Sequence, residues 1–89
     1  MISSDLTIIN KLGLHARAAA KLAATANHFS CQCQLTAKGK QVDCKSIMAL
    51  MLLAAAKGTE VRLCCDGADE EAALKAIVTL IKGRFDEEE

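Results

Sequence analysis

The sequence predicts a small α+β protein built as an open-faced sandwich of two layers, one a sheet and the other helices. Three observations predict this class. Strand-like and helix-like segments follow one another in the order β-α-β-β-α-β-α. The strand segments alternate apolar and polar residues, which is typical of a sheet with one solvated face. The helix segments have apolar stripes at helical spacing, so they can cover the other face of the sheet.

All 89 residues are expected to form a single domain, residues 1–89. The sequence contains no proline, no linker rich in serine and glycine and no internal repeat, so nothing marks a domain boundary. A chain of this length buries roughly 60 to 65% of the surface that its unfolded form exposes. Hydrophobic residues make up 52% of the sequence but include only two aromatic ones, Phe29 and Phe85, so the core is mainly aliphatic.

The chain begins with a strand and a helix. Residues 5–9, DLTII, predict the first strand because β-branched residues lie beside polar ones. Gly13 then permits the turn into a helix over 16–27. One face of that helix follows the i, i+3, i+4, i+7 spacing of a buried stripe, and a mildly basic face lies beside it. The buried face consists of Ala19, Leu22, Ala23 and Ala26, and the basic face of Arg17, Lys21 and Thr25.

A hairpin follows the first helix. Residues 30–37, SCQCQLTA, alternate cleanly and predict a half-solvated antiparallel strand. Lys38 and Gly39 form the turn, and a short partner strand is expected over 40–44. The expected inward-facing residues are Cys31, Cys33, Leu35 and Ala37, and the outward-facing ones are Ser30, Gln32, Gln34 and Thr36.

A second helix of two or three turns is expected after Ser46, which stands at the N-cap position, with Gly58 at its end. Its apolar residues lie almost all the way round the helix. One sheet face cannot cover them all, so several should remain exposed. These residues are Ile47, Met48, Leu50, Met51, Leu52 and Leu53.

The last two elements are a strand over 59–66 and a helix from Asp69 to Lys82. Acidic residues at the start of the helix and Lys82 at its end match the helix dipole. The acidic tail, residues 86–89, is expected to lie in solvent. Ferredoxin-like packing shares most of this element order, so periodicity leaves the strand arrangement open. The inward-facing strand residues are Val61, Leu63 and Cys65, and the helix stripe is Ala73, Leu74, Ile77, Leu80 and Ile81.

The charge and hydropathy of the chain exclude several classes of protein. Eleven basic residues balance eleven acidic ones, and no stripe of lysine and arginine alternates with aromatic residues, so nucleic-acid binding is not expected. The N-terminal segment lacks the basic and apolar regions of a signal peptide, and no window reaches the ~18 apolar residues that span a bilayer. We therefore expect a cytoplasmic protein that does not insert into membranes.

The five cysteines predict reduced thiols in the core. Their number is odd and they lie within apolar patterns, which suits small buried side chains better than a disulfide framework. A metal carrier is the alternative, because thiols and imidazoles could supply soft ligands. The spacing argues against a metal site, since Cys31 and Cys33 face the same buried side and no C-x-x-C loop is present. The candidate ligands are Cys31, Cys33, Cys64, Cys65, His15 and His28.

His15 lies at or just before the start of the predicted 16–27 helix. Free backbone N–H groups point outward there, and the positive end of the helix dipole opposes protonation of the imidazole, which keeps it neutral and nucleophilic near pH 7. The same groups can bind an anion, and Arg17 can reach a phosphate on the ring. These residues favour a histidine that accepts a phosphoryl group. The alternative is a histidine that only ends a turn, beside a solvated arginine.

The sequence lacks two features that would allow His15 to catalyse hydrolysis or to bind a nucleotide. No Asp or Glu lies close to His15 in the chain to orient its ring, and no Gly-rich phosphate loop or other nucleotide-binding motif occurs. His15 is therefore better suited to relaying a phosphoryl group than to hydrolysing a substrate, and no cofactor is implied.

Two motifs resemble a known family. The stretch NKLGLHAR (10–17) and the run CKSIMAL (44–50) are similar to the HPr phosphocarrier family of the bacterial phosphoenolpyruvate-dependent phosphotransferase system. The similarity covers nearly the whole chain. It implies a four-stranded antiparallel sheet in the order 1-4-2-3 with three helices on one face. It also implies a phosphoryl-transfer intermediate rather than a stand-alone enzyme.

The resemblance assigns roles to individual residues. His15 would take a phosphoryl group from phosphorylated enzyme I on its Nδ1 atom and pass it to a IIA domain of a sugar permease or a regulatory branch, while Arg17 stabilises the phosphate. Such a carrier is expected to be a monomer with an exposed surface that docks several partners. The candidate contact residues are Ala16, Ala20, Lys21, Ile47, Met48 and Met51.

Other aspects of the resemblance leave choices open. Ser46 matches the serine that HPr kinase/phosphorylase modifies in many bacteria, although an N-cap hydroxyl needs no further role. Ala18 replaces the proline that the family usually has, so a looser first helical turn is expected.

The ending, residues 83–89, is similar to the nitrogen-branch paralogue NPr, whereas residues 45–48 are more similar to sugar-branch HPr. A catalytically silent docking regulator is a further alternative, but such proteins lack the active histidine.

Overall fold

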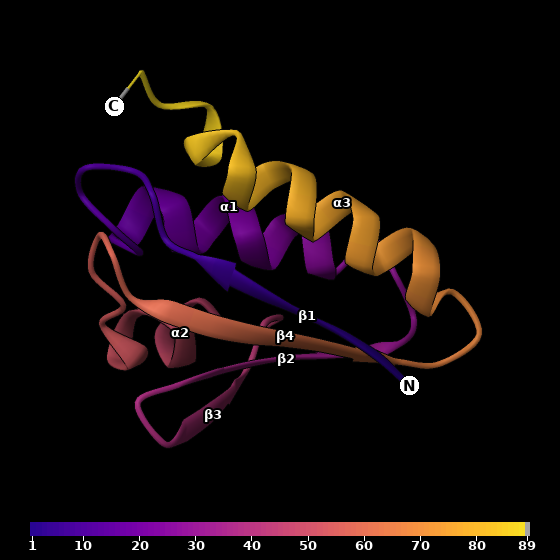
Figure 1. Ribbon diagram of the computed structural model, residues 1–89. Helices are drawn as coiled ribbons and strands as arrows, with labels where there is room; N and C mark the ends of the chain where they lie inside the picture. Colours follow the sequence, from indigo (N-terminus) through magenta and orange to yellow (C-terminus); the bar gives the residue numbers. More distant parts are fainter. Residues whose placement is uncertain (89) are drawn as a thin grey trace.

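The computed structural model of the chain, which describes residues 1–88, is a two-layer α+β sandwich (Figure 1). Four antiparallel strands form one sheet in the order β1-β4-β2-β3, and three helices pack on one of its faces. The predicted fold class and the strand order implied by the resemblance are both confirmed. The elements are β1 (Ile2–Thr7), α1 (Ala16–Ala26), β2 (Gln32–Ala37), β3 (Lys40–Asp43), α2 (Ile47–Leu53), β4 (Glu60–Asp66) and α3 (Glu70–Lys82).

The core lies between the helices and the inward-facing side of the sheet. The small residues of α1 let this helix pack closely, and Ala18 and Ala19 are fully buried. The alternation expected along β2 and β4 is confirmed, because every inward-facing residue of the two strands is buried. These residues are Cys33, Leu35 and Ala37 in β2 and Val61, Leu63 and Cys65 in β4.

β1 lies earlier in the chain than the sequence pattern indicates. It spans Ile2–Thr7 rather than residues 5–9, because its whole length pairs with β4, from Ile2 opposite Cys65 to Thr7 opposite Glu60. The outer face of the sheet is solvated, so the polar residues near the start of the strand can point away from the core.

α2 ends at Leu53, earlier than the sequence pattern indicates, which puts the end of this helix at Gly58. Ala54 takes the left-handed conformation, with a φ of 53°, and stops the helix although it is not a glycine. The following carbonyl, that of Ala55, accepts a hydrogen bond from the backbone N–H of Leu14 at 2.8 Å. This bond joins the end of α2 to the segment that leads into α1.

The chain after α3 contacts α1, because Nζ of Lys21 donates a hydrogen bond to the carbonyl of Phe85. Residues 84–86 form a short 3₁₀ turn in which all three φ angles are positive, and Phe85 at its centre is fully buried. The expectation that the acidic tail lies in solvent is therefore wrong for Glu87, which is half-buried. The acidic residues on either side of Glu87 are exposed as expected, and residue 89 lies outside the described residues.

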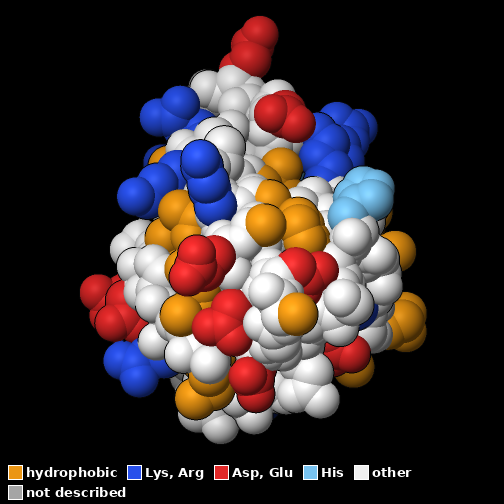
Figure 2. Space-filling model, turned by 90° about the vertical axis from the view of Figure 1, so that its right-hand side faces the viewer, with side chains coloured by type: hydrophobic (Ala, Val, Ile, Leu, Met, Phe, Trp, Pro, Cys, Tyr) orange, Lys and Arg blue, Asp and Glu red, His pale blue; other side chains and the backbone are white. Residues whose placement is uncertain are grey.

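Acidic side chains gather at the end of the molecule where β4 leads into α3 (Figure 2). The carboxylates of Asp66 and Glu70 lie 3.5 Å and 3.2 Å from the N-terminal ammonium group there. α1 begins at the opposite end (Figure 1). His15 is therefore remote from this acidic cluster. Among residues 1–88, no helix is long and apolar enough to cross a membrane.

Substituting Gly13 with alanine is expected to lower the free energy of unfolding by about 2 kcal/mol or more. Gly13 has a φ of +67°, and an added Cβ would lie 2.7 Å from the carbonyl oxygen of Ala55 and 2.9 Å from Cα of Ala56. Both atoms belong to the backbone, so neither can move cheaply. Urea denaturation measures the loss. Gly39→Ala is the matched control. Gly39 also has a positive φ, of +77°, but an added Cβ there would contact no other atom, so the substitution should cost only about 1 kcal/mol.

Candidate functional site

His15 lies at the N-cap position of α1, as the sequence predicts. Its backbone is extended, and its carbonyl accepts the first hydrogen bond of the helix, from the N–H of Ala19 at 2.8 Å. The imidazole makes no capping bond to the helix, and the side chain is 27% exposed. The ring is therefore accessible beside the N–H groups of the first helical turn.

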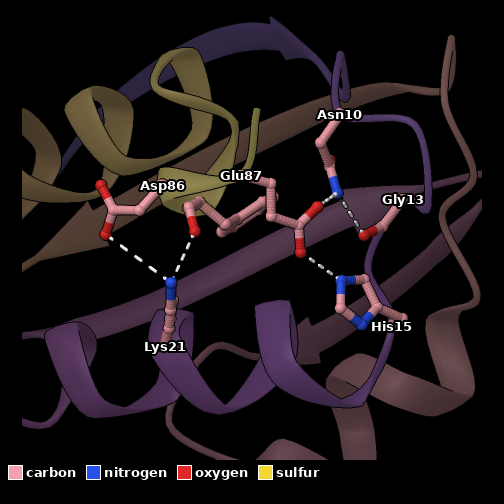
Figure 3. Close-up of polar contacts among 7 residues, drawn as sticks. Asn10, Gly13, His15, Lys21, Asp86 and Glu87 are labelled. Atoms are coloured by element: carbon pink, nitrogen blue, oxygen red, sulfur yellow. Dashed lines mark hydrogen bonds and ion pairs between the residues drawn. The ribbon is translucent and has the colours of Figure 1, made fainter. Parts of the chain in front are cut away.

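The imidazole of His15 contacts a carboxylate from the other end of the chain (Figure 3). Nε2 of His15 lies 2.5 Å from Oε2 of Glu87. The other oxygen of Glu87 accepts a hydrogen bond from Nδ2 of Asn10 at 2.9 Å, and the same nitrogen donates to the carbonyl of Gly13 at 2.7 Å. The side chain of Asn10 thus joins the loop before α1 to the C-terminal segment.

The contacts of Glu87 favour its ionised form. The hydrogen bond from Asn10, followed by the one with His15, holds the pKa of the Glu87 carboxyl below its ordinary value, and the positive charge of Arg17 acts in the same direction. Glu87 is therefore negatively charged beside His15 near neutral pH.

The contact of Glu87 with Asn10 is expected to persist near neutral pH and to be lost in acid. Because folding lowers the pKa of Glu87, its contribution to stability is complete above the ordinary pKa of about 4.3 and is lost as the pH falls through the lowered value. The backbone amide signals of Phe85 and Glu87 in NMR spectra should stay constant between about pH 7 and 5 and shift below about pH 4. Glu87→Gln should remove this acid transition. A transition of equal size in that variant would contradict the assignment to Glu87.

Arg17 is exposed in the first turn of α1 and shares an open depression of about 790 Å³ with His15. Lys11, Arg17 and the N-terminal end of the helix offer positive charge to an anion there, while the carboxylates of Glu87 and Glu88 lie in the same lining. The two residues that the sequence predicts to handle a phosphoryl group therefore line the same depression. Its lining residues are Lys11, Leu12, His15, Ala16, Arg17, Glu87 and Glu88.

An exposed apolar surface lies on the α2 side of His15. A second depression, of about 280 Å³, is lined by His15, Met51 and residues 54–56, so the surface of α2 is continuous with the histidine. Met48 and Leu52 are 69% and 72% exposed, which confirms that α2 keeps apolar residues in solvent. The candidate contact residues with exposed side chains are Ala16, Ala20, Ile47, Met48 and Met51.

Lys21, the remaining candidate contact residue, is engaged within the chain (Figure 3). Its Nζ donates a hydrogen bond to the carbonyl of Phe85 at 2.8 Å and lies 3.8 Å from a carboxylate oxygen of Asp86. Lys21 therefore ties the C-terminal segment to α1 and is less available to a partner than its helical position suggests.

Ser46 is the N-cap residue of α2, as predicted. Its Oγ accepts a hydrogen bond from the backbone N–H of Ala49 at 3.2 Å, and its side chain is half-buried. Ile47 and Met48 follow it directly and are exposed. The hydroxyl thus lies at the border of the apolar surface defined by α2.

Asn10 and Glu87 are the site residues that the sequence pattern does not reveal. No acidic residue lies close to His15 along the chain, and the carboxylate that reaches it comes from 72 positions away. The available signal is Phe85, an aromatic residue within a charged tail. A large apolar side chain in such a segment indicates an anchor to the core, and the anchor carries Glu87 with it.

The cysteines are free thiols, and Cys31, Cys33, Cys44 and Cys65 are buried, which confirms the predicted core role. The Sγ of Cys33 lies 3.7 Å from that of Cys31 and 3.9 Å from that of Cys65. Within residues 1–88, this cluster forms without either histidine of the alternative metal site. Burial raises the pKa of Cys31 to about 12 and that of Cys33 to about 11, so both thiols are protonated at neutral pH.

Only one thiol of the native protein is expected to react rapidly with a disulfide reagent near pH 8. Cys64 is partly exposed on the outer side of β4, whereas the other four thiols are buried. Burial raises their pKa values and excludes the reagent. Titration with the reagent should detect one rapidly reacting thiol per chain in the native protein and five in the unfolded protein. Cys64→Ser should remove the rapidly reacting thiol of the native protein, and retention of it would contradict this assignment.

Comparisons with known proteins agree on one family. The family model described as the PTS HPr component phosphorylation site matches residues 2–83. The phosphocarrier protein HPr of Cupriavidus necator is 53% identical over 89 residues, which is 100% of both chains. The phosphocarrier protein NPr of Shewanella violacea is 40% identical over 97% of this chain and 94% of its own.

A solved structure gives the same result. The crystal structure of HPr-C-His from Thermoanaerobacter tengcongensis matches with a TM-score of 0.96 and 45% identity, over 100% of both chains. The fold and the sequence thus point to the same relatives, and the histidine lies within the range of the family model. The chain therefore belongs to the HPr family of phosphocarrier proteins of the phosphotransferase system.

Proposed function

We propose that this chain relays a phosphoryl group on His15, accepting it from phosphorylated enzyme I and passing it to IIA domains. The observation that carries the proposal is the location of an accessible imidazole at the N-terminus of α1, in an open depression that Arg17 also lines. A nucleophile that exchanges a group between two proteins must reach the surface, and a pocket that enclosed its substrate would prevent this.

The site can stabilise the transferred group without hydrolysing it. As the phosphoryl group arrives, the negative charge on its oxygens is offset by the guanidinium of Arg17 and the N-terminal N–H groups of α1. A charge-assisted hydrogen bond from Arg17 is worth about 1.5 to 3 kcal/mol. The residues require no cofactor. Phosphorus moves from one imidazole nitrogen to another, so the nitrogen–phosphorus bond is exchanged rather than lost.

The same surface would serve both partners in turn. The exposed residues of α2, together with Ala16 and Ala20 of α1, give an apolar surface beside His15. Apolar contact residues of this kind can repack against different partners, and Met48 and Met51 are especially adaptable. The proposal includes a monomeric carrier that works in the cytoplasm, where enzyme I and the IIA domains would meet it.

Regulation at Ser46 is part of the proposal. A phosphate on Ser46 would lie at the N-terminus of α2, where the backbone N–H groups favour negative charge. It would also add charge beside the apolar surface of Ile47 and Met48 and so hinder docking to enzyme I. Incubation with ATP and HPr kinase/phosphorylase should add one phosphoryl group to the wild type and none to Ser46→Ala.

The sugar branch is the favoured context. The chain shares 53% identity with an HPr and 40% with an NPr. The two contexts make different predictions for a competition experiment in which the phosphorylated chain is offered a sugar-specific IIA domain and a nitrogen-branch IIA domain at equal concentration. Faster transfer to the sugar-specific domain is expected. Faster transfer to the nitrogen-branch domain would assign the chain to the regulatory branch.

The proposed relay is tested by reconstitution from purified proteins. The chain is incubated with enzyme I and phosphoenolpyruvate, and its intact mass is measured before and after a IIA domain is added. One acid-labile phosphoryl group is expected, and it should leave when the IIA domain is present. A chain that binds enzyme I but remains unmodified would instead be a silent docking regulator.

A further inference from the structure

Asn10 holds the side chain of Glu87 against one ring nitrogen of His15. Within residues 1–88, Asn10 is the one polar side chain that is fully buried, and its Nδ2 donates to both the carbonyl of Gly13 and Oε1 of Glu87. Glu87 is thereby aimed with its second oxygen at Nε2 of His15, at 2.5 Å. A carboxylate held by a buried amide has a defined position, unlike one on a free terminal segment.

The segment that holds Glu87 is fixed by independent contacts. Phe85 is fully buried, and its carbonyl accepts a hydrogen bond from Nζ of Lys21. Residues 84–86 all have positive φ angles, a strained arrangement that persists only when neighbouring contacts enforce it. The family model ends at residue 83, so these contacts lie beyond the range that the family match covers.

The chemistry of the contact determines where the hydrogen on the ring lies. An ionised carboxylate has no hydrogen to donate, so Nε2 of His15 must be the donor to Glu87. A neutral imidazole has one N–H and one lone pair, so the lone pair is then on Nδ1. Figure 3 shows that the second ring nitrogen faces away from Glu87. Glu87 therefore leaves this nitrogen unengaged, and the His15 side chain as a whole is 27% exposed.

We propose that Glu87 is a positioning residue that holds His15 as the Nε2–H tautomer and so presents the lone pair of Nδ1 to the incoming phosphoryl group. The inference rests on the proposed function, because it explains which ring nitrogen accepts. Asn10 supports the role by fixing the orientation of the carboxylate.

The transfer step balances with this assignment. The lone pair of Nδ1 forms the new nitrogen–phosphorus bond, and the electron pair of the breaking bond returns to the histidine of enzyme I. The hydrogen on Nε2 stays in place, so the ring of His15 gains positive charge as the bond forms. The carboxylate of Glu87 offsets that charge, as an aspartate does for the imidazolium in a serine protease triad. The other charged groups around the depression are Lys11, Arg17 and Glu88.

Glu87→Gln tests the assignment while keeping the shape of the side chain. A glutamine has one acceptor oxygen and one donor nitrogen, but Asn10 and the Nε2–H of His15 both require an acceptor. With its oxygen toward Asn10, the new amide would donate to Nε2 and favour the Nδ1–H tautomer. ¹⁵N NMR of the ring at a pH where His15 is neutral should show this shift. The rate of phosphoryl acceptance from enzyme I should fall about tenfold or more.

Two further variants make the result decisive. Glu71→Gln is the control, since Glu71 is an exposed carboxylate of α3 that does not line the depression, and it should retain the wild-type tautomer and rate. Glu87→Ala should give a mixture of tautomers and an intermediate rate. An unchanged tautomer in Glu87→Gln would overturn the proposal, and so would a changed tautomer with an unchanged rate. The tautomer is measured without enzyme I, so this outcome remains distinguishable from failure of the relay itself.

Discussion

Replacing His15 with alanine is expected to reduce phosphoryl transfer through this chain to the background of the assay. The substitution removes the accepting nitrogen, and Arg17 and the N-terminus of α1 can bind an anion but cannot form a bond to phosphorus. The transfer of labelled phosphate from enzyme I and phosphoenolpyruvate to a IIA domain measures the effect. Stability should change little, because the imidazole does not cap the helix and is partly exposed.

His28→Ala is the matched control for this prediction. His28 is the other histidine of the chain, and it is exposed just after α1. Its substitution should leave transfer unchanged. If His15→Ala retained transfer while His28→Ala lost it, the role assigned to His15 would be wrong.

Replacing Phe85 with alanine is expected to lower the free energy of unfolding by about 3 to 5 kcal/mol. Phe85 is fully buried, and it is one of only two aromatic residues in a core made mainly of small and aliphatic side chains. Few neighbours are large enough to fill the space that it leaves. A loss of this size is a large part of the total stability of a small domain, which is typically about 5 to 15 kcal/mol.

Chemical denaturation of Phe85→Ala measures this loss, and Phe29→Ala provides the comparison. Phe29 is only partly buried beside the core, so its removal should cost clearly less. Phe85→Ala should also release Glu87 from His15, since the two residues are connected through the same anchored segment. If the two variants lost the same stability, Phe85 would not be the anchor described.

Much of the fold follows from patterns that the sequence displays. The strict alternation along β2 and β4 and the alanine face of α1 predict the sheet and its covering helix, because each records which side chains must be buried. The Lys38–Gly39 turn is confirmed as well, with φ angles of 52° and 77°. The end of α2 is not predictable in this way. Ala54 adopts a left-handed conformation there, and the carbonyl of the next residue, Ala55, accepts a hydrogen bond from Leu14, which is 41 positions away.

The site residues also fall into two groups, those that the sequence predicts and those that it does not. His15, Arg17 and Ser46 are predictable because their roles depend on local position at a helix N-terminus. Asn10 and Glu87 are not, because their contact joins residues 77 positions apart and depends on where the segment after α3 lies. The tail looks like a solvated acidic segment until the burial of Phe85 is known. Such long-range contacts have no spacing rule in a single sequence.

The position of the phosphoryl group is the most direct test of this account. The chain is labelled with ¹⁵N, phosphorylated by enzyme I and phosphoenolpyruvate, and examined by ³¹P and ¹⁵N NMR, which distinguish the two ring nitrogens of each histidine. The account predicts one phosphoryl group, bound to Nδ1 of His15, with Nε2 still bearing its hydrogen toward Glu87. A phosphoryl group on Nε2 of His15 or on another residue, or a chain that takes up none, would contradict it.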